Sequence, residues 1–210
     1  MSTVTDQLNL APEHTHTNCC PAELMEFVIK RGEGQLAANG CVVVNTGERS
    51  GRSPKDKFLV EHPDSRENID WGKVNQPITE AQFDTALEIA TKYINAQDDV
   101  FVFEGFTGAD INHRLGVKVV TTLAWHSLFA QTLFIKPGSK SDAGDGSWNH
   151  DWTVINAGCH KLTKEEQEAL GHNGETYIAQ SLERKTVIIL GTEYAGEMKK
   201  GLFYAMNYDM

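Results

Sequence analysis

TVIILGTEYAGEMKKG, residues 186–201, is a run of apolar, mostly β-branched residues that passes directly into a segment of glycines and charges. Residues 186–191 are typical of a buried strand, and residues 177–181 are expected to pair with them. Ligands of α/β proteins tend to bind where a strand passes into a loop, so this junction is a candidate site. The residues alone favour an alternative, in which the charged segment is the first turn of a helix whose lysines and glutamates face water.

Further strands and a few helices are predicted on both sides of this stretch. The interleaving favours an α/β fold with a mixed β-sheet and flanking helices over a strictly alternating parallel sheet. Residues 41–45, CVVVN, are expected to form a buried strand, and Thr79 is expected to cap a helix that continues to Asn95. Residues 1–20 are polar, and we expect a flexible leader there. The other strands are predicted at 58–61, 100–103, 117–121 and 153–156, and the other helices at 21–31, 124–134 and 164–170.

Composition excludes several classes of function. The 210 residues carry a formal charge of −10, which argues against a protein that displaces counterions from nucleic acid. No run approaches the ~20 apolar residues of a membrane helix, and the N-terminus lacks the basic and apolar regions of a secretion signal. The four cysteines have no metal-like spacing, which indicates reduced cytosolic thiols. We therefore expect a cytoplasmic protein without nucleic-acid or membrane partners.

A second candidate site is the basic loop TGERSGRSPKDK, residues 46–57. Glycines let a backbone approach a ligand closely, and guanidinium groups bind carboxylate or phosphate at two points. The loop therefore can form an anion pocket around Arg52. The alternatives are a solvated basic turn or a phosphorylation site around Ser53, and the chemistry alone favours them slightly. The loop is no Walker A motif, because it lacks the GK[ST] ending.

Three other polar groups are interpreted as structural. Asp110 and His113, in the segment EGFTGADINHR, are expected to organise a turn. His126 is expected in the core or at a subunit surface. Cys159 and His160 are neighbours, but no third partner suggests itself, so a Cys–His nucleophile has little support.

Taken together, the motifs resemble those of one enzyme family. GRSPKDKF at 51–58 is similar to the signature loop of ATP-dependent phosphoenolpyruvate carboxykinases, and GTEYAGEMKKG at 191–201 is similar to their second diagnostic segment. The likeness runs from about residue 20 to 208 and continues in the expected order through KRGEG at 30–34, WGKVNQPI at 71–78, GFTGAD at 105–110 and AWHSLFAQTLFIKP at 124–137.

The resemblance implies an activity and roles for particular residues. Such enzymes convert oxaloacetate and ATP to phosphoenolpyruvate, CO2 and ADP in gluconeogenesis, using Mg-ATP and a second divalent ion, Mn2+. By motif, Arg52 is expected to bind the substrate carboxylate and CO2, and Tyr194 to contact the substrate. Lys200 is expected to bind substrate and, as a neutral amine, to be a ligand of Mn2+, with Lys199 adding to the local positive field.

The resemblance also implies that part of the family's machinery is missing. Residues 21–210 match the N-terminal, substrate-binding domain, and the C-terminal nucleotide-binding domain is expected to be absent because no GxxxxGK[ST] motif occurs. We expect this chain alone to be inactive and to bind neither Mn2+ nor Mg-ATP tightly. The alternative is a stand-alone, non-catalytic module that binds a dicarboxylate or docks onto a partner. A structural remnant without a ligand is less attractive, because Arg52, Tyr194 and Lys200 are all present.

Overall fold

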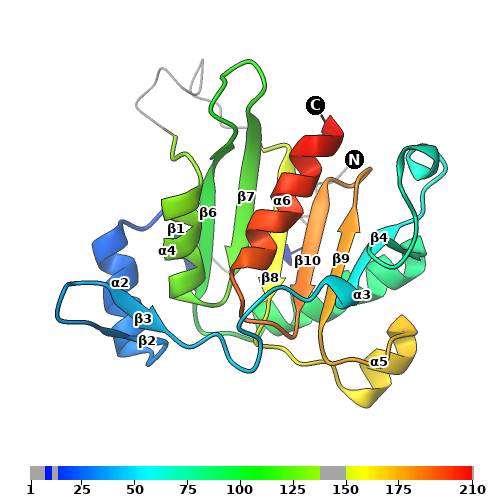
Figure 1. Cartoon of the computed structure of the whole chain (residues 1–210). Coiled ribbons are helices and arrows are strands. Elements are labelled where there is room, and N and C mark those ends of the chain that lie inside the picture. Colours follow the sequence, from blue (N-terminus) through cyan, green and yellow to red (C-terminus); the bar gives the residue numbers. More distant parts are fainter. Residues whose placement is uncertain (1–7, 11–13, 138–149, 210) are drawn as a thin grey trace.

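The computed structural model describes residues 8–10, 14–137 and 150–209, and an eight-stranded sheet forms its centre (Figure 1). Strands β6 and β7 and strands β10 and β9 pair antiparallel, while the other neighbours pair parallel. The predicted α/β fold with a mixed sheet is therefore confirmed. In sheet order the strands are β1 (Thr15–Thr17), β6 (Val100–Thr107), β7 (Leu115–Thr121), β8 (Trp152–Ala157), β10 (Thr186–Leu190), β9 (Tyr177–Ser181), β4 (Lys57–Val60) and β5 (Gln76–Ile78).

Helices cover both faces of the sheet, which gives three layers. On one face, α4 (Ala124–Leu133) packs on β6 and β7, α6 (Gly196–Asp209) packs on β8 and β10, and α2 (Pro21–Lys30) packs on α4. On the opposite face, α3 (Glu80–Asn95) packs on β8, β9 and β10, and α5 (Lys164–Leu170) packs on α3. The short 3-10 turns are η2 (Pro54–Asp56) and η3 (Arg66–Asn68).

Strand β10 shows why the sheet is buried on both faces. All five of its residues are buried. Val187 and Ile189 belong to the core cluster that contains α6, whereas Ile188 and Leu190 belong to the cluster that contains α3. Because successive side chains of a strand point to opposite faces, a continuous apolar run is what a strand between two helical layers requires.

The ends of the helices follow the capping signals of the sequence. The side chain of Thr79 accepts a hydrogen bond from the backbone N–H of Gln82, which confirms the predicted cap of α3. Thr163 caps α5 in the same way, and Gly171 ends that helix in the left-handed conformation at φ 65°. Such caps satisfy backbone groups that the first and last turns leave unpaired.

Residues 15–17, which lie within the leader expected over residues 1–20, form the edge strand β1. This strand pairs parallel with β6, and the ring of His16 stacks on Phe101 with centroids 5.2 Å apart. The Nε2 atom of His16 also lies 2.7 Å from the carboxylate of Asp99. The polar strand is therefore held by a hydrogen bond and a ring contact whose partners lie far away in the sequence.

The strand expected at residues 41–45 forms, but the expectation that it is buried is wrong. Strand β3 (Val42–Val44) pairs only with β2 (Gly34–Leu36), in a hairpin separate from the main sheet, and Val43 is 58% exposed. A short β-branched run fits an exposed hairpin as well as a buried strand, so its composition did not distinguish them. The prediction assumed that the basic loop follows a strand of the central sheet. The loop instead follows a strand of the separate hairpin.

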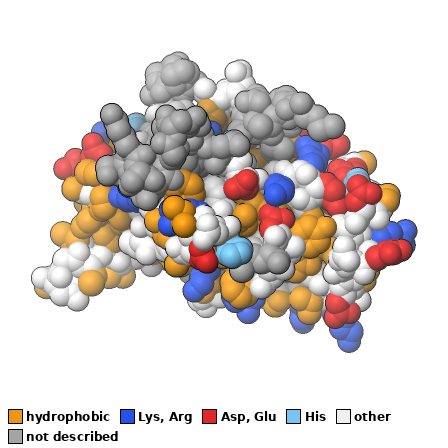
Figure 2. All heavy atoms as spheres, turned by 90° about the horizontal axis from the view of Figure 1, so that it is seen from above, with side chains coloured by type: hydrophobic (Ala, Val, Ile, Leu, Met, Phe, Trp, Pro, Cys, Tyr) orange, Lys and Arg blue, Asp and Glu red, His pale blue; other side chains and the backbone are white. Residues whose placement is uncertain are grey.

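The surface agrees with the composition. On the face seen from above, the coloured side chains of both charges are scattered among hydrophobic ones and form no single basic area (Figure 2). Among the described residues, no helix is both long and apolar enough to cross a membrane. The stretch PGSKSDAGDGSWNHD, residues 137–151, has the composition of a surface loop, and it lies largely outside the described residues.

Candidate functional site

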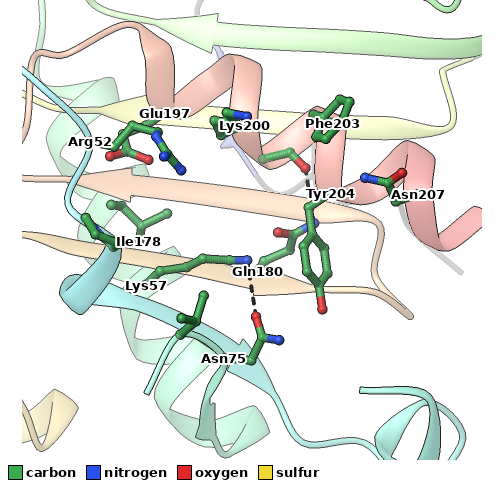
Figure 3. A pocket seen from close by; sticks show the side chains of 13 residues that line it. Arg52, Lys57, Asn75, Ile178, Gln180, Glu197, Lys200, Phe203, Tyr204 and Asn207 are labelled. Atoms are coloured by element: carbon green, nitrogen blue, oxygen red, sulfur yellow. Dashed lines mark hydrogen bonds between the residues drawn. The ribbon is translucent and has the colours of Figure 1, made fainter. Parts of the chain in front are cut away.

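The candidate site is a cavity of about 310 Å³ between helix α6 and the loop and strand that contain Arg52 and Lys57 (Figure 3). Arg52 lies two residues before the η2 turn, which Pro54 begins. Lys57 is the first residue of β4, and Lys200 lies on α6. Two segments about 140 residues apart in the sequence thus meet at one cavity. The sequence-predicted residues Arg52 and Lys200 are brought together there.

Three cations at this cavity lack a carboxylate partner. Within the described part of the chain, Arg52, Lys57 and Lys200 form no ion pair at 4.0 Å or less. Arg52 and Lys200 are exposed, and the Nζ atom of Lys200 lies 4.9 Å from the ring centroid of Phe203. A cavity that collects unpaired positive charge in an acidic protein is suited to an anion.

Lys57 is the most enclosed of these cations. Its Nζ atom lies 3.8 Å from the ring centroid of Tyr204 and 3.5 Å from Oδ1 of Asn75. Burial lowers the pKa of Lys57 to about 8; the nearby Glu197 opposes that shift and the charge of Arg52 adds to it. The protein therefore surrounds this ammonium with an aromatic face and an amide, and with no carboxylate in direct contact.

Glu197 joins the two sides of the cavity. Its carboxylate accepts a hydrogen bond of 2.6 Å from the backbone N–H of Ser53, the residue after Arg52. Burial raises the pKa of Glu197, although this hydrogen bond and the charges of Arg52 and Lys57 work against that shift. The bond joins the Arg52 loop to the first turn of α6, so Glu197 orients the loop, although it makes no ion pair at 4.0 Å or less with a described cation of the cavity.

Tyr194, the third predicted substrate residue, does not line this cavity. It lies just before α6, where its carbonyl accepts a hydrogen bond of 3.2 Å from the N–H of Glu197. A Cβ atom on Gly196 would come within 2.4 Å of the Tyr194 ring. Glycine at 196 thus allows the tyrosine to fold back over the first turn of the helix.

A buried hydrogen-bond network supports the backbone ahead of Tyr194. The Nε2 atom of His126 lies 2.7 Å from the carbonyl of Glu193, and because a carbonyl only accepts, Nε2 carries the proton. The other ring nitrogen then accepts from Thr121 and Asn156. Burial lowers the pKa of His126 to about 4, against the effect of the Glu193 bond, so the ring is neutral at pH 7. His126 belongs to the core, as one of the two sequence interpretations expected.

The remaining reactive groups do not form a second site. Burial raises the pKa of the Cys159 thiol to about 11, and His160 pairs with Glu166 at 2.9 Å. A thiol in that state is a poor nucleophile. Asp110 accepts a hydrogen bond from the N–H of Asn112 and organises an exposed turn, as predicted. No group of three His, Cys, Asp or Glu side chains suited to a metal occurs among the described residues.

Comparison with known proteins agrees with the motifs at the cavity. The model of the family described as phosphoenolpyruvate carboxykinase matches residues 13–210. The chain belongs to the phosphoenolpyruvate carboxykinase family. It is 44% identical over 199 residues to the phosphoenolpyruvate carboxykinase (ATP) of Bacillus pumilus, covering 95% of this chain and 37% of that protein. The phosphoenolpyruvate carboxykinase (ATP) of Geobacillus kaustophilus is 43% identical, covering 99% of this chain and 39% of that protein. The protein of the same name from Bacillus subtilis is 44% identical, covering 91% of this chain and 35% of that protein.

The carboxykinase relatives are thus much longer, and this chain spans less than two-fifths of their length. Within that span, sequence reasoning named Arg52 and Lys200 but left out Lys57, Glu197 and Tyr204. Lys57 and Glu197 stood in the quoted motifs GRSPKDKF and GTEYAGEMKKG, which were the available signals. The role of Lys57 depends on helix α6, whose course beyond the first turn was not predicted.

Proposed function

We propose that this chain supplies the substrate-binding part of an ATP-dependent phosphoenolpyruvate carboxykinase that acts in gluconeogenesis in the cytoplasm. The whole protein would convert oxaloacetate and ATP to phosphoenolpyruvate, CO2 and ADP. Membership of the family supports the reaction class. The observation that carries the site is the cavity itself, where Arg52, Lys57 and Lys200 converge without carboxylate partners.

The proposed roles follow from charge and position. Arg52 is exposed at the mouth of the cavity, and its guanidinium would bind the substrate carboxylate at two points. Lys200, one turn into α6, would bind the same anion from the other side. Tyr194 would contact the substrate from the turn before α6, beside the cavity. As CO2 is released, the positive charges would stabilise the enolate that develops on the remaining three carbons.

The residues present do not by themselves make a site for the family's Mn2+. Lys200 is the single ligand that the resemblance assigns here, and the described residues contain no three-membered cluster of His, Cys, Asp or Glu. Divalent manganese prefers oxygen and imidazole ligands in sets. Further ligands would have to come from outside these residues, and the same holds for the phosphate-binding loop of the nucleotide. We therefore derive no step through the metal or through ATP.

Titration calorimetry of the purified chain with phosphoenolpyruvate tests the proposal. The wild type is expected to bind, and Arg52→Ala is expected to lower the affinity at least tenfold, because it removes a charged two-point contact. Lys55→Ala is the matched control: Lys55 is an exposed cation of the same loop that does not line the cavity. Equal losses in both variants would indicate a non-specific effect of charge and would overturn the site.

The same preparation distinguishes the proposed carboxykinase role from a non-catalytic module. A carboxykinase fragment should gain phosphoenolpyruvate formation when it is joined to the remaining part, about two-thirds, of a relative such as the B. subtilis protein. That activity should be lost again in Arg52→Ala. Ligand binding by the chain together with an inactive fusion would favour a dicarboxylate-binding module instead.

A further inference from the structure

Lys57 differs from the other two cations of the cavity in how it is held. Arg52 and Lys200 are exposed, whereas Lys57 begins the buried strand β4 and its side chain extends along the cavity towards Asn75 and Tyr204 (Figure 3). The ammonium is 3.8 Å from the centroid of the Tyr204 ring, which comes from α6. Three elements thus fix the position of one positive charge deep in the cavity.

This position is unfavourable for the charge in the unliganded protein. Neither Asn75 nor Tyr204 carries a negative charge, and the oxygen of Asn75 is at the 3.5 Å limit of a hydrogen bond. The nearby carboxylate, Glu197, is already bound to the backbone of Ser53. Arg52 adds a like charge, and burial together with that charge lowers the pKa of Lys57. A partly buried cation without a counter-ion is destabilising unless a ligand supplies the missing charge.

An anion with a single charge would neutralise one of the three cations and leave the other two. The cavity has a volume of about 310 Å³, sufficient for a ligand of three or four carbons with a group at each end. Its polar lining includes Arg52 of the loop before η2, Lys57 at the start of β4 and Gln180 of β9. The two fixed cations therefore match a small molecule that has two anionic groups.

We propose that Lys57 is a specificity-determining residue, which binds the second anionic group of a ligand whose first carboxylate is bound by Arg52. The second group is a carboxylate or a phosphate, since an ammonium accepts either as a point charge. This inference rests on the proposed function and deepens it, because it assigns the preference for a doubly anionic ligand to a residue outside the predicted set. Tyr204 and Asn75 act as positioning residues for the ammonium.

The test compares two ligands that differ in the second anionic group. Phosphoenolpyruvate has a phosphate and a carboxylate, and pyruvate has the carboxylate alone. Titration calorimetry gives the ratio of their affinities for the wild type, for Lys57→Met and for Lys73→Met, an exposed lysine that does not line the cavity. Lys57→Met is expected to reduce the preference for phosphoenolpyruvate about tenfold and to change pyruvate affinity little, because methionine keeps the aliphatic stem. Lys73→Met is expected to leave the ratio unchanged.

The possible results separate this inference from the proposed function. An unchanged ratio in a folded Lys57→Met chain, with binding still dependent on Arg52, would overturn the role of Lys57 and leave the proposed function intact. No binding of either ligand by the wild type would overturn both. A urea titration of Lys57→Met shows whether the variant is folded. Should it fail to fold, Lys57→Gln supplies the same comparison, and an unchanged ratio there would have the same meaning.

Discussion

Two arginines of this chain, Arg31 and Arg52, stand in opposite environments. The guanidinium of Arg31 donates to Glu33 and Asp99 at 2.7 Å and to the carbonyl of Thr122 at 2.8 Å. Burial opposes its charge, but these partners raise the pKa of Arg31. Arg52 makes no ion pair with any described residue. The charge of Arg31 is neutralised by carboxylates of the fold, whereas the charge of Arg52 is available to a ligand.

The difference indicates what each region is for. Arg31, Glu33 and Asp99 link the end of helix α2 to the edge of the sheet. Glu33 also accepts a hydrogen bond from the backbone N–H of Trp125 at the start of α4. Internal partners of this kind stabilise the fold and leave nothing for a ligand. The cations of the cavity make no ion pair with a described residue, so we expect them to contribute less to the fold. Paired charge is therefore structural here, and the binding site is where unpaired cations gather around one cavity.

The largest expected effect is on stability and concerns His126. Both ring nitrogens of this buried histidine have hydrogen-bond partners within the fold, so it resembles Arg31 and not Arg52. Its pKa of about 4 in the folded chain lies below its ordinary value of 6.5, so the unfolded chain takes up the proton first as pH falls. The free energy of unfolding should therefore be intact above pH 6.5 and decline towards pH 4, by about 3 kcal/mol in total. Urea titrations across this range, with His126→Gln as the comparison, measure the histidine's share. An equally steep decline in both chains would show that other groups cause it.

A smaller loss is expected when the paired arginine is removed. Arg31→Met leaves the carboxylates of Glu33 and Asp99 without their cation, and it should lower the free energy of unfolding by about 2 kcal/mol, less than for a fully buried pair. Lys30→Met is the matched control, because Lys30 is the exposed neighbour on the same helix. Its effect should stay within about 0.5 kcal/mol. Urea titration at pH 7 measures both, and equal effects would contradict the distinction between paired and unpaired charge.

The smallest effect, and one of opposite sign, is expected for Lys57. The pKa of Lys57 in the folded chain, about 8, is below its ordinary value of 10.5, so at pH 7 the protonated side chain works against folding. Lys57→Met should therefore unfold at an equal or slightly higher urea concentration than the wild type at pH 7, and the difference should shrink as pH rises above 8. A clear loss of stability would mean that the contact with Tyr204 serves the fold.

How much the sequence predicted depended on whether a signal was local. The apolar run of β10, residues 187–190, and the cap at Thr79 are local, and both were predicted correctly. Strand β1 is polar, and it is held by His16 and Asp99, which are 83 residues apart. No window of sequence contains that pair.

The site followed the same rule. Motifs named Arg52 and Lys200, and the structure brings both to one cavity. The contact of Lys57 with Tyr204 exists because α6 lies across β8 and β10, so it depends on packing and not on spacing. A solvated helix turn and a ligand site can have the same composition. From the residues alone, the charges of the segment 191–201 were therefore interpreted as facing water.

The most direct test measures two quantities, phosphoenolpyruvate affinity and free energy of unfolding, for Arg52→Ala and Arg31→Met. The account predicts that Arg52→Ala loses at least tenfold in affinity and stays within about 0.5 kcal/mol of wild-type stability. It predicts the reverse for Arg31→Met, with stability lowered and affinity retained under conditions where the variant is folded. An Arg52→Ala chain that is destabilised as much as Arg31→Met and still binds phosphoenolpyruvate normally would contradict it.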